Sequence, residues 1–375
     1  MLTLFRSNSI PNKNTKVQTL EEALPFGTNA LEASSARSAI SLLLKKLSRS
    51  DRRGVAIPGY TAEGLVQAIK WASLKPYFYE QTANLLISEY RLRACLSANN
   101  DVSTCIVVHP FGILQEISRV KKICAEFGVN VVEDFAQCPM FGKEFDRSAR
   151  GIAAIYSFNK WLPISDGAVV TGDTRKLVFN ETLPELNPRR RLSNKYFSKH
   201  LDYNRQLNAT SDLKKARILL HATAREYGRY YEIQSTEIRA CAPDYSFSKI
   251  QESFDIFQVV RRRRENAIRL CDGLRAVGIE VVYETPSFKT GFPIAVPVRL
   301  RTQKERNHFL DGLFKHGIIG HVQTDKWQFF CMSSNMHKGE KEFVAKHLLL
   351  PINENYEFEH MDHIATAMEK ISKGV

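Results

Sequence analysis

The stretch Val131–Thr171, VVEDFAQCPMFGKEFDRSARGIAAIYSFNKWLPISDGAVVT, decides the fold of this chain. It opens within an apolar, β-branched run, Val129–Glu133, that follows a helical pattern ending at Phe127-Gly128. Such a run predicts a buried parallel strand. Asp134 would therefore lie at the carboxyl end of a strand, which is the end at which open α/β sheets bind ligands.

A second apolar run, Ile152–Ser157, predicts a strand that brings Ser157 and Lys160 to the same edge. Ala168–Thr171 predicts one more strand, because it follows an Asp-Gly turn. A carboxylate that faces a lysine across a crevice suits pyridoxal phosphate, since the amine forms an imine with the aldehyde and the carboxylate keeps the ring nitrogen protonated. The pattern by itself leaves another interpretation open, in which Asp134 caps a helix and Lys160 is a solvated loop residue.

Strands and helices alternate from Val55 onward. The expected order is strand Val55–Pro58, helix Ala62–Ala72, strand Lys75–Tyr79, helix Ser88–Leu96, strand Thr104–His109 and helix Leu114–Phe127. This order predicts a mostly parallel sheet with helices on both faces. His109 falls at a strand end, where a hydrogen-bonded structural role is the common one for a single histidine.

The second half of the chain predicts helices first and then a mixed segment. Residues 173–240 are polar and helix-rich, with helices expected around Asp212–Tyr231. The later elements are helix Ile250–Val277, strands Glu280–Tyr283 and Phe292–Val298, and helices Gln303–His316 and Glu359–Ser372. We therefore expect an α/β protein with an N-terminal arm (1–28), a large domain (29–250) and a smaller α+β C-terminal domain (251–375).

Serines precede the helical run Ser38–Leu44, in the order Ser34-Ser35-Ala36-Arg37. Serine is a preferred residue at a helix start, where free backbone N–H groups and the positive end of the dipole suit a phosphate. Arg37 would either bind that phosphate with its planar guanidinium or be a solvated residue beside an ordinary cap.

Six short motifs resemble those of the DegT/StrS family of sugar aminotransferases, in the family's order. They are Ile57-Pro58-Gly59-Tyr60-Thr61, His109-Pro110-Phe111-Gly112, Glu133-Asp134-Phe135-Ala136-Gln137, Ser157-Phe158-Asn159-Lys160, Tyr245-Ser246-Phe247-Ser248-Lys249-Ile250-Gln251 and Leu350-Pro351-Ile352-Asn353. The resemblance covers roughly residues 26–370 and implies the type I pyridoxal phosphate-transferase fold.

The resemblance also implies roles for individual residues. Lys160 would form the imine with pyridoxal 5'-phosphate and move the proton, while Asp134 would pair with the ring nitrogen. Gln137 would bind the phenolic oxygen and Ser157 the phosphate. The remaining cofactor contacts expected from the resemblance come from Ser35, Ala36, Arg37, Tyr60 and His109.

Three departures from the family pattern accompany the resemblance. Only Phe158 and Asn159 separate the serine from the lysine, as in a branch with an SxRKxLPxPDGG segment. Ala62 replaces the aromatic residue that stacks on the ring, which leaves Tyr60 or His109 to substitute. Asp244 and Ser246 stand where the family has the asparagine and arginine of its NYR segment, which act across the dimer.

Composition is that of a globular protein, with 43% hydrophobic and 25% charged residues and a net charge of +13. The charge favours anionic ligands, and its two sharpest clusters are Arg189–Arg191 and Arg261–Arg264. We interpret the second cluster as a solvated helix face and expect no nucleic-acid binding. Seven scattered cysteines without a CxxC pair predict no metal site and a reducing compartment, and no apolar run suggests a membrane span.

The function implied by the resemblance is transfer of an amino group from an amino acid such as glutamate to a keto group of a nucleotide-linked sugar. The family usually serves polysaccharide or antibiotic sugar synthesis, and it implies a homodimer. The cysteine pattern and the lack of a leader-like or membrane-spanning run predict a cytoplasmic protein. Two alternatives remain open: dehydration or deoxygenation of a sugar, which relatives perform with histidine in place of the lysine, and a non-catalytic binding role on the same fold.

Overall fold

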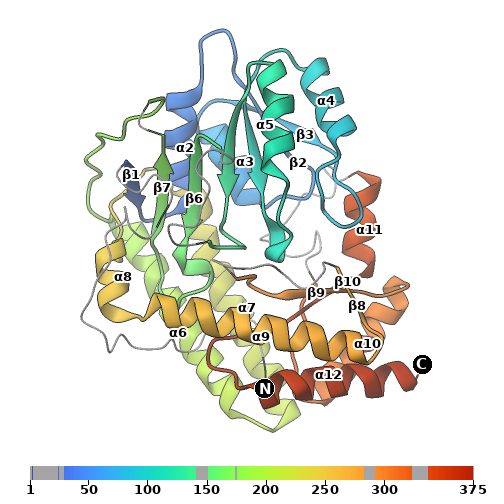
Figure 1. The fold of residues 1–375 in the computed structure, drawn as a ribbon. Helices are drawn as coiled ribbons and strands as arrows, with labels where there is room; N and C mark the ends of the chain where they lie inside the picture. Colours follow the sequence, from blue (N-terminus) through green and yellow to red (C-terminus); the bar gives the residue numbers. More distant parts are fainter. Residues whose placement is uncertain are drawn as a thin grey trace.

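A seven-stranded sheet forms the centre of the molecule, in the strand order β1-β7-β6-β5-β4-β2-β3 (Figure 1). The computed structural model describes residues 2, 24, 29–140, 151–173, 175–282, 292–322 and 337–374. The strands of this sheet are β1 (Ala30–Ala33), β2 (Gly54–Pro58), β3 (Lys75–Tyr79), β4 (Val102–Val108), β5 (Asn130–Asp134), β6 (Ala153–Ser157) and β7 (Ala168–Gly172). Strands β3, β2, β4, β5 and β6 are parallel, whereas β7 runs antiparallel to both β6 and β1. The predicted mostly parallel sheet is confirmed.

Helices cover both faces of the sheet, as the alternating order predicted. The helices of this part are α2 (Ala36–Leu47), α3 (Glu63–Trp71), α4 (Glu89–Ala98) and α5 (Ile117–Glu126). Alternate residues of β5 point to opposite faces. Val132 belongs to a hydrophobic cluster with α2 and α3, while Val131 belongs to a cluster with α4 and α5. This burial on both sides explains why the strand is a continuous apolar run.

Two long helices, α6 (Pro188–Ala209) and α7 (Leu213–Thr236), pack against each other and form a hairpin (Figure 1). Only α7 was expected as a defined helix. The signal for α6 was present, because Asn187 accepts a hydrogen bond from the backbone of Arg190 and Pro188 occupies the first helical position. Asp212 caps α7 in the same way.

The prediction of one helix over Ile250–Val277 is wrong. The structure has α8 (Phe247–Ser253) and α9 (Ile256–Ala276), separated by Phe254 in an extended conformation. Asp255 accepts a hydrogen bond from the backbone of Gln258 and so begins a new helix. The helical periodicity of the sequence did not reveal this break, although Asp255 is a residue type that commonly caps helices.

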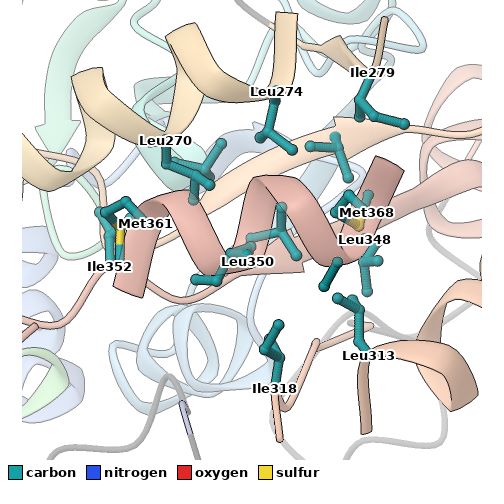
Figure 2. Packing of buried hydrophobic residues seen from close by; sticks show 14 of the residues in the cluster. Leu270, Leu274, Ile279, Leu313, Ile318, Leu348, Leu350, Ile352, Met361 and Met368 are labelled. Atoms are coloured by element: carbon teal, nitrogen blue, oxygen red, sulfur yellow. The ribbon is translucent and has the colours of Figure 1, made fainter. Parts of the chain in front are cut away.

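The C-terminal part is built on a three-stranded antiparallel sheet in the order β10-β9-β8. Its elements are β8 (Glu280–Val281), β9 (Val296–Arg299), α10 (Gln303–Lys315), α11 (Lys338–Lys346), β10 (His347–Leu350) and α12 (Phe358–Lys373). Its core gathers side chains from α9, α10, α12 and β10 (Figure 2). Strands β1 and β10 and helix α11 were not predicted, and Cys331 and most of the expected arm lie outside the described residues.

Within the described residues, none of the helices combines the length and apolar character that crossing a membrane requires. The six described cysteines are buried and free, in agreement with their interpretation as small apolar residues. Leu2 pairs with Ile318 and packs into the C-terminal core.

Candidate functional site

The strand register brings the predicted residues to one edge of the large sheet. Ala168 pairs with Ala33 of β1 on one side and with Ser157 of β6 on the other, so the ends of β1 and β6 lie level. Asp134 pairs with Val108 at the end of β4 and so lies at the same carboxyl edge. Helix α2 follows β1 directly, and its first turn therefore lies at the same edge of the sheet as Ser157, two strands away.

Asp134 is buried, with 9% of its surface exposed, and its Oδ1 accepts a hydrogen bond of 2.8 Å from the backbone N–H of Ala136. Because strand residues alternate, Asp134 lies on the α2 and α3 side of the sheet, like Val132. Gln137 is also buried, and its Oε1 has no hydrogen-bond partner within the described part of the chain. A buried amide oxygen without a partner fits a ligand donor.

Glu133 lies on the opposite face and organises the loop after β4. It accepts a hydrogen bond of 2.8 Å from the backbone of Gly151, and its other oxygen lies 3.2 Å from Nε2 of His109. The backbone N–H of Gln115 donates to Nδ1 of His109, so Nε2 carries the proton that Glu133 accepts. His109 also stacks on Phe135, with ring centroids 4.7 Å apart. These contacts favour the structural role for His109.

Lys160 ends a short 3₁₀ turn, η3 (Phe158–Lys160), directly after β6. The first residue of this turn, Phe158, and the residue that follows it, Trp161, are large, buried aromatics: Phe158 packs against Trp161 at 5.4 Å and against Phe247 at 5.5 Å. The carbonyl of Trp161 accepts a hydrogen bond of 3.2 Å from Arg263. Aromatic packing and the hydrogen bond from Arg263 therefore both hold the backbone around Lys160 in place.

Arg263 forms a buried ion pair with Glu354, with 2.6 Å between Nη2 and Oε2. Only 2% of its surface is exposed, so the interpretation of Arg261–Arg264 as a solvated face is wrong at this position. Arg261 is exposed, because it lies on another side of α9. Arg263 lies on the buried face of α9, where it connects the Lys160 turn to the segment after β10.

A chain of hydrogen bonds connects Ser157 to helix α7. Ser157 donates to Asn159 at 2.8 Å, Asn159 donates to the hydroxyl of Tyr230 at 2.8 Å, and Tyr230 donates to the carbonyl of Ser165 at 2.8 Å. Burial raises the pKa of Tyr230 well above its ordinary value, so its hydroxyl stays protonated. The α6–α7 hairpin thus reaches the candidate site, which motif reasoning had not anticipated.

Helix α2 begins as predicted. Ser35 is its cap and accepts a hydrogen bond of 3.2 Å from the backbone of Ser38, while Ala36 and Arg37 form the first turn. Arg37 is buried, with 9% of its surface exposed, which excludes the solvated interpretation. Its guanidinium lies 4.8 Å from the ring centre of Tyr231 and 5.6 Å from that of Trp71.

Tyr60 follows β2 at the same edge, but its ring packs into an apolar cluster. Its ring centre lies 5.4 Å from that of Phe343 in α11 and 6.4 Å from that of Phe111. Tyr60 therefore joins the large sheet to the C-terminal part. Ala62 begins α3 without a side-chain cap.

Asp166 holds the segment that resembles the family's NYR motif. Its two oxygens accept hydrogen bonds of 3.1 Å from the backbone N–H groups of Asp244 and Tyr245. Burial raises the pKa of Asp166 to about 6, although these two N–H groups act in the opposite direction. The neighbouring Gly167 has a φ of +109°, and a Cβ there would lie 3.1 Å from the carbonyl of Tyr245. Only glycine fits this close approach without strain.

Two further polar atoms at this edge were missed as site candidates. Ser34 Oγ, beside the α2 cap, and Thr61 Oγ1, after β2, are buried and have no hydrogen-bond partner among the described residues. Both residues adjoin predicted ones, and their burial could not be read from the motifs. Unpartnered buried polar atoms at Ser34, Thr61, Gln137 and Arg37 fit a polar, anionic ligand such as pyridoxal phosphate.

The fold and this edge define a class of enzymes, and comparison with known proteins identifies it. The sequence profile of the DegT/DnrJ/EryC1/StrS aminotransferase family matches residues 4–220, which is more than half of the chain. The chain therefore belongs to this family of pyridoxal phosphate-dependent aminotransferases. No curated protein matches it significantly.

Solved structures with the same fold include sugar aminotransferases of low sequence identity, and also 3-amino-5-hydroxybenzoic acid synthase. The pyridoxal phosphate form of a putative sugar aminotransferase, Spr1654 from Streptococcus pneumoniae, is 16% identical with a TM-score of 0.61, covering 98% of this chain and 94% of that one. PseC from Helicobacter pylori, an aminotransferase involved in the biosynthesis of pseudoaminic acid, is 16% identical with a TM-score of 0.61, covering 92% of this chain and 87% of that one. DesI, solved with its TDP-sugar product, is 15% identical with a TM-score of 0.56, covering 92% and 81%.

Proposed function

We propose that this chain moves an amino group from an amino acid, with glutamate as the expected donor, to a keto group of a nucleotide-linked sugar. The observation that carries the proposal is the meeting of Asp134, Ser157 and the first turn of α2 at one sheet edge, just before the turn that ends at Lys160. The substrate class rests on DesI, which was solved with a TDP-sugar, and on the net charge of +13, which favours anions.

Each candidate residue has a separate task at this edge. Asp134 would pair with the ring nitrogen, Gln137 would bind the phenolic oxygen, and Ser157 would bind the phosphate together with the first turn of α2, Ser35 to Arg37. When bound, pyridoxal phosphate supplies an aldehyde for the amine and a ring that accepts electrons from the substrate carbon.

The protein's own part in the chemistry is to position groups and move a proton. Asp134 is oriented by the N–H of Ala136, which leaves its second oxygen for the ligand. Lys160 would take the proton from the substrate carbon and return it. The buried aromatics Phe158 and Trp161 fix the backbone on either side of the lysine, so the amine samples a limited volume.

The test is covalent trapping of the cofactor. Pyridoxal phosphate is added to the purified protein, absorbance is recorded before and after borohydride, and the reduced adduct is located by peptide mapping. We expect the adduct on Lys160 and a loss of about a thousandfold or more in aminotransfer activity for Lys160→Ala. An adduct on another lysine, or retained activity in the variant, would show that the assignment is wrong.

The chain contains a matched control lysine. Ser246-Phe247-Ser248-Lys249 has the same S-F-x-K spacing as the segment ending at Lys160, but Lys249 is exposed and donates to the carbonyl of Asp244. Lys249→Ala should keep the adduct and the activity. Comparing Lys160→Ala with Lys249→Ala shows whether pyridoxal phosphate reacts specifically at Lys160 or with lysines in general.

Two other readings are distinguished by the same preparation. Loss of water from a sugar without gain of nitrogen, seen by mass, would favour dehydration. The residues Ala62, Asp244 and Ser246 motivate the alternative of a non-catalytic protein, whereas the presence of Asp134, Gln137, Ser157 and Lys160 together speaks against it. Tight cofactor binding with steady turnover would exclude this alternative. We also propose that the protein is a cytoplasmic homodimer with the site between its subunits. Sedimentation would test whether the protein is a dimer.

A further inference from the structure

Two buried arginines, one at the start of α2 and one in the first turn of α6, form no ion pair within the described residues. Arg190, in the first turn of α6, has none of its surface exposed, and Arg37 has 9% exposed. In both side chains Nε and Nη1 have no hydrogen-bond partner, and neither guanidinium forms an ion pair with a carboxylate of the described residues. Burying a charge without a partner costs several kcal/mol.

The hydrogen bond that the Arg190 guanidinium forms within the described residues does not neutralise it. Nη2 donates a hydrogen bond of 2.6 Å to the carbonyl of Glu237, which is the residue that ends α7. The Glu237 carboxylate accepts from the backbone of Arg239 instead. Burial lowers the pKa of Arg190, and the nearby positive charge of Arg37 acts in the same direction, whereas Tyr230, Cys241 and Glu237 raise it. The two cations therefore face the same region of the molecule.

That region adjoins the candidate phosphate site. The backbone N–H of Ser34, next to the α2 cap, donates a hydrogen bond of 2.9 Å to the carbonyl of Cys241, in the segment that begins at Glu237. Tyr230 and Tyr231 are consecutive in α7: the first is bonded to the Ser157–Asn159 pair and the second lies on Arg37. Arg190 and Arg37 are thus joined to Ser157 through one hairpin.

We propose that Arg37 and Arg190 form an anion-binding pair that holds a phosphate group from within one subunit. Two planar guanidinium groups with free N–H donors match the geometry and charge of a phosphate monoester. This rests on the proposed function, because the phosphate is that of the cofactor. The pair supplies the positive charge that Asp244 and Ser246 cannot supply, and the α6–α7 hairpin is the structural element that adds it.

The first experiment uses inorganic phosphate and needs no cofactor. Thermal unfolding is measured in increasing phosphate, against chloride at equal ionic strength, for the natural chain and for Arg190→Met and Arg37→Met. We expect a saturable stabilisation in the natural chain and an increase of about tenfold or more in the apparent Kd for each variant. Arg189→Met is the control, since Arg189 is exposed, adjoins Arg190 and carries the same charge.

The second experiment assigns the phosphate to its source. Affinities for pyridoxal phosphate, pyridoxal and UDP are measured by fluorescence. We expect Arg190→Met to weaken pyridoxal phosphate binding and leave pyridoxal unchanged. Phosphate stabilisation no greater than that of chloride, or equal losses in Arg189→Met and Arg190→Met, would overturn the proposal. An effect on UDP alone would overturn its assignment to the cofactor.

The two proposals can fail separately. Trapping on Lys160 with unaltered affinity in Arg190→Met would keep the enzyme assignment and reject the arginine pair. Phosphate binding that depends on Arg190, without an adduct on Lys160, would support the anion site and reject the cofactor chemistry. Arg190→Lys retains the positive charge but lacks the planar guanidinium group. We expect its apparent Kd for phosphate to lie between those of the natural chain and Arg190→Met.

Discussion

Arg263 and Arg190 are both buried arginines from the two sharpest basic clusters, yet their surroundings differ. Arg263 pairs with Glu354 at 2.6 Å and also donates to the carbonyl of Trp161. Arg190 donates to one carbonyl and has two buried nitrogens without a partner among the described residues. The first arginine is neutralised by the protein and stabilises the Lys160 turn. The second forms no ion pair within the described residues, and we propose that a ligand anion supplies its counter-charge.

The largest effect is expected when the carboxylate of the Arg263–Glu354 ion pair is removed. Glu354→Ala leaves Arg263 buried without a partner, and we expect the free energy of unfolding to fall by about 3–5 kcal/mol, measured by urea denaturation. The double variant Arg263→Met/Glu354→Met is the control, since it removes both charges and should recover most of the loss. A loss below about 1 kcal/mol in the single variant would show that the pair is not needed for stability.

The second prediction concerns the buried carboxyl group of Asp166, whose ionisation makes the free energy of unfolding depend on pH. Burial raises the pKa of Asp166 in the folded state to about 6, above its ordinary value of 3.8, so the folded state favours the protonated form. Its stabilising contribution is therefore complete below pH of about 4 and is lost as pH rises through about 6, a change of about 3 kcal/mol in total.

Asp166→Asn should abolish this part of the pH dependence, and urea denaturation between pH 4 and 7 measures it. The variant keeps one hydrogen-bond acceptor for the backbone of Asp244 or Tyr245. Parallel pH profiles for the two proteins would mean that the carboxyl does not titrate in this range.

The third prediction concerns the stability of Arg190→Met, measured in phosphate-free buffer and compared with that of Glu354→Ala. Removing an uncompensated charge offsets the lost hydrogen bond to Glu237, so we expect a change of no more than about 1 kcal/mol in the free energy of unfolding. A loss as large as that of Glu354→Ala would contradict the distinction between the two arginines.

The smallest effect is expected at Gly64, which lies against the Arg37 side chain. A Cβ at this position would meet Nε and Nη2 of Arg37 at 3.1 Å, so Gly64→Ala should shift the guanidinium slightly. We expect a decrease of about twofold to fivefold in phosphate affinity, or less than about 1 kcal/mol. Gly278→Ala is a control for the glycine change itself, although its φ of +76° adds local strain.

The local features of the chain were sufficient to predict the five parallel strands of the large sheet and the places of Asp134 and Ser157 at strand ends, but not β1 or β10. β-Branched runs identified β5 and β6, and the alternation with helices implied that Asp134 and Ser157 end at one edge. Serines marked the start of α2. These signals are local, because strand and helix patterns depend on residues that lie close together in the sequence.

The tertiary structure alone decided what the arginines and the aromatic residues do. Arg190 and Arg263 occur in similar basic runs, and the sequence pattern does not distinguish their neighbours. Glu354 lies 91 positions from Arg263, and Glu237 lies 47 from Arg190. Whether a buried charge is neutralised depends on which distant segments pack against it, so only the folded chain separates the two roles.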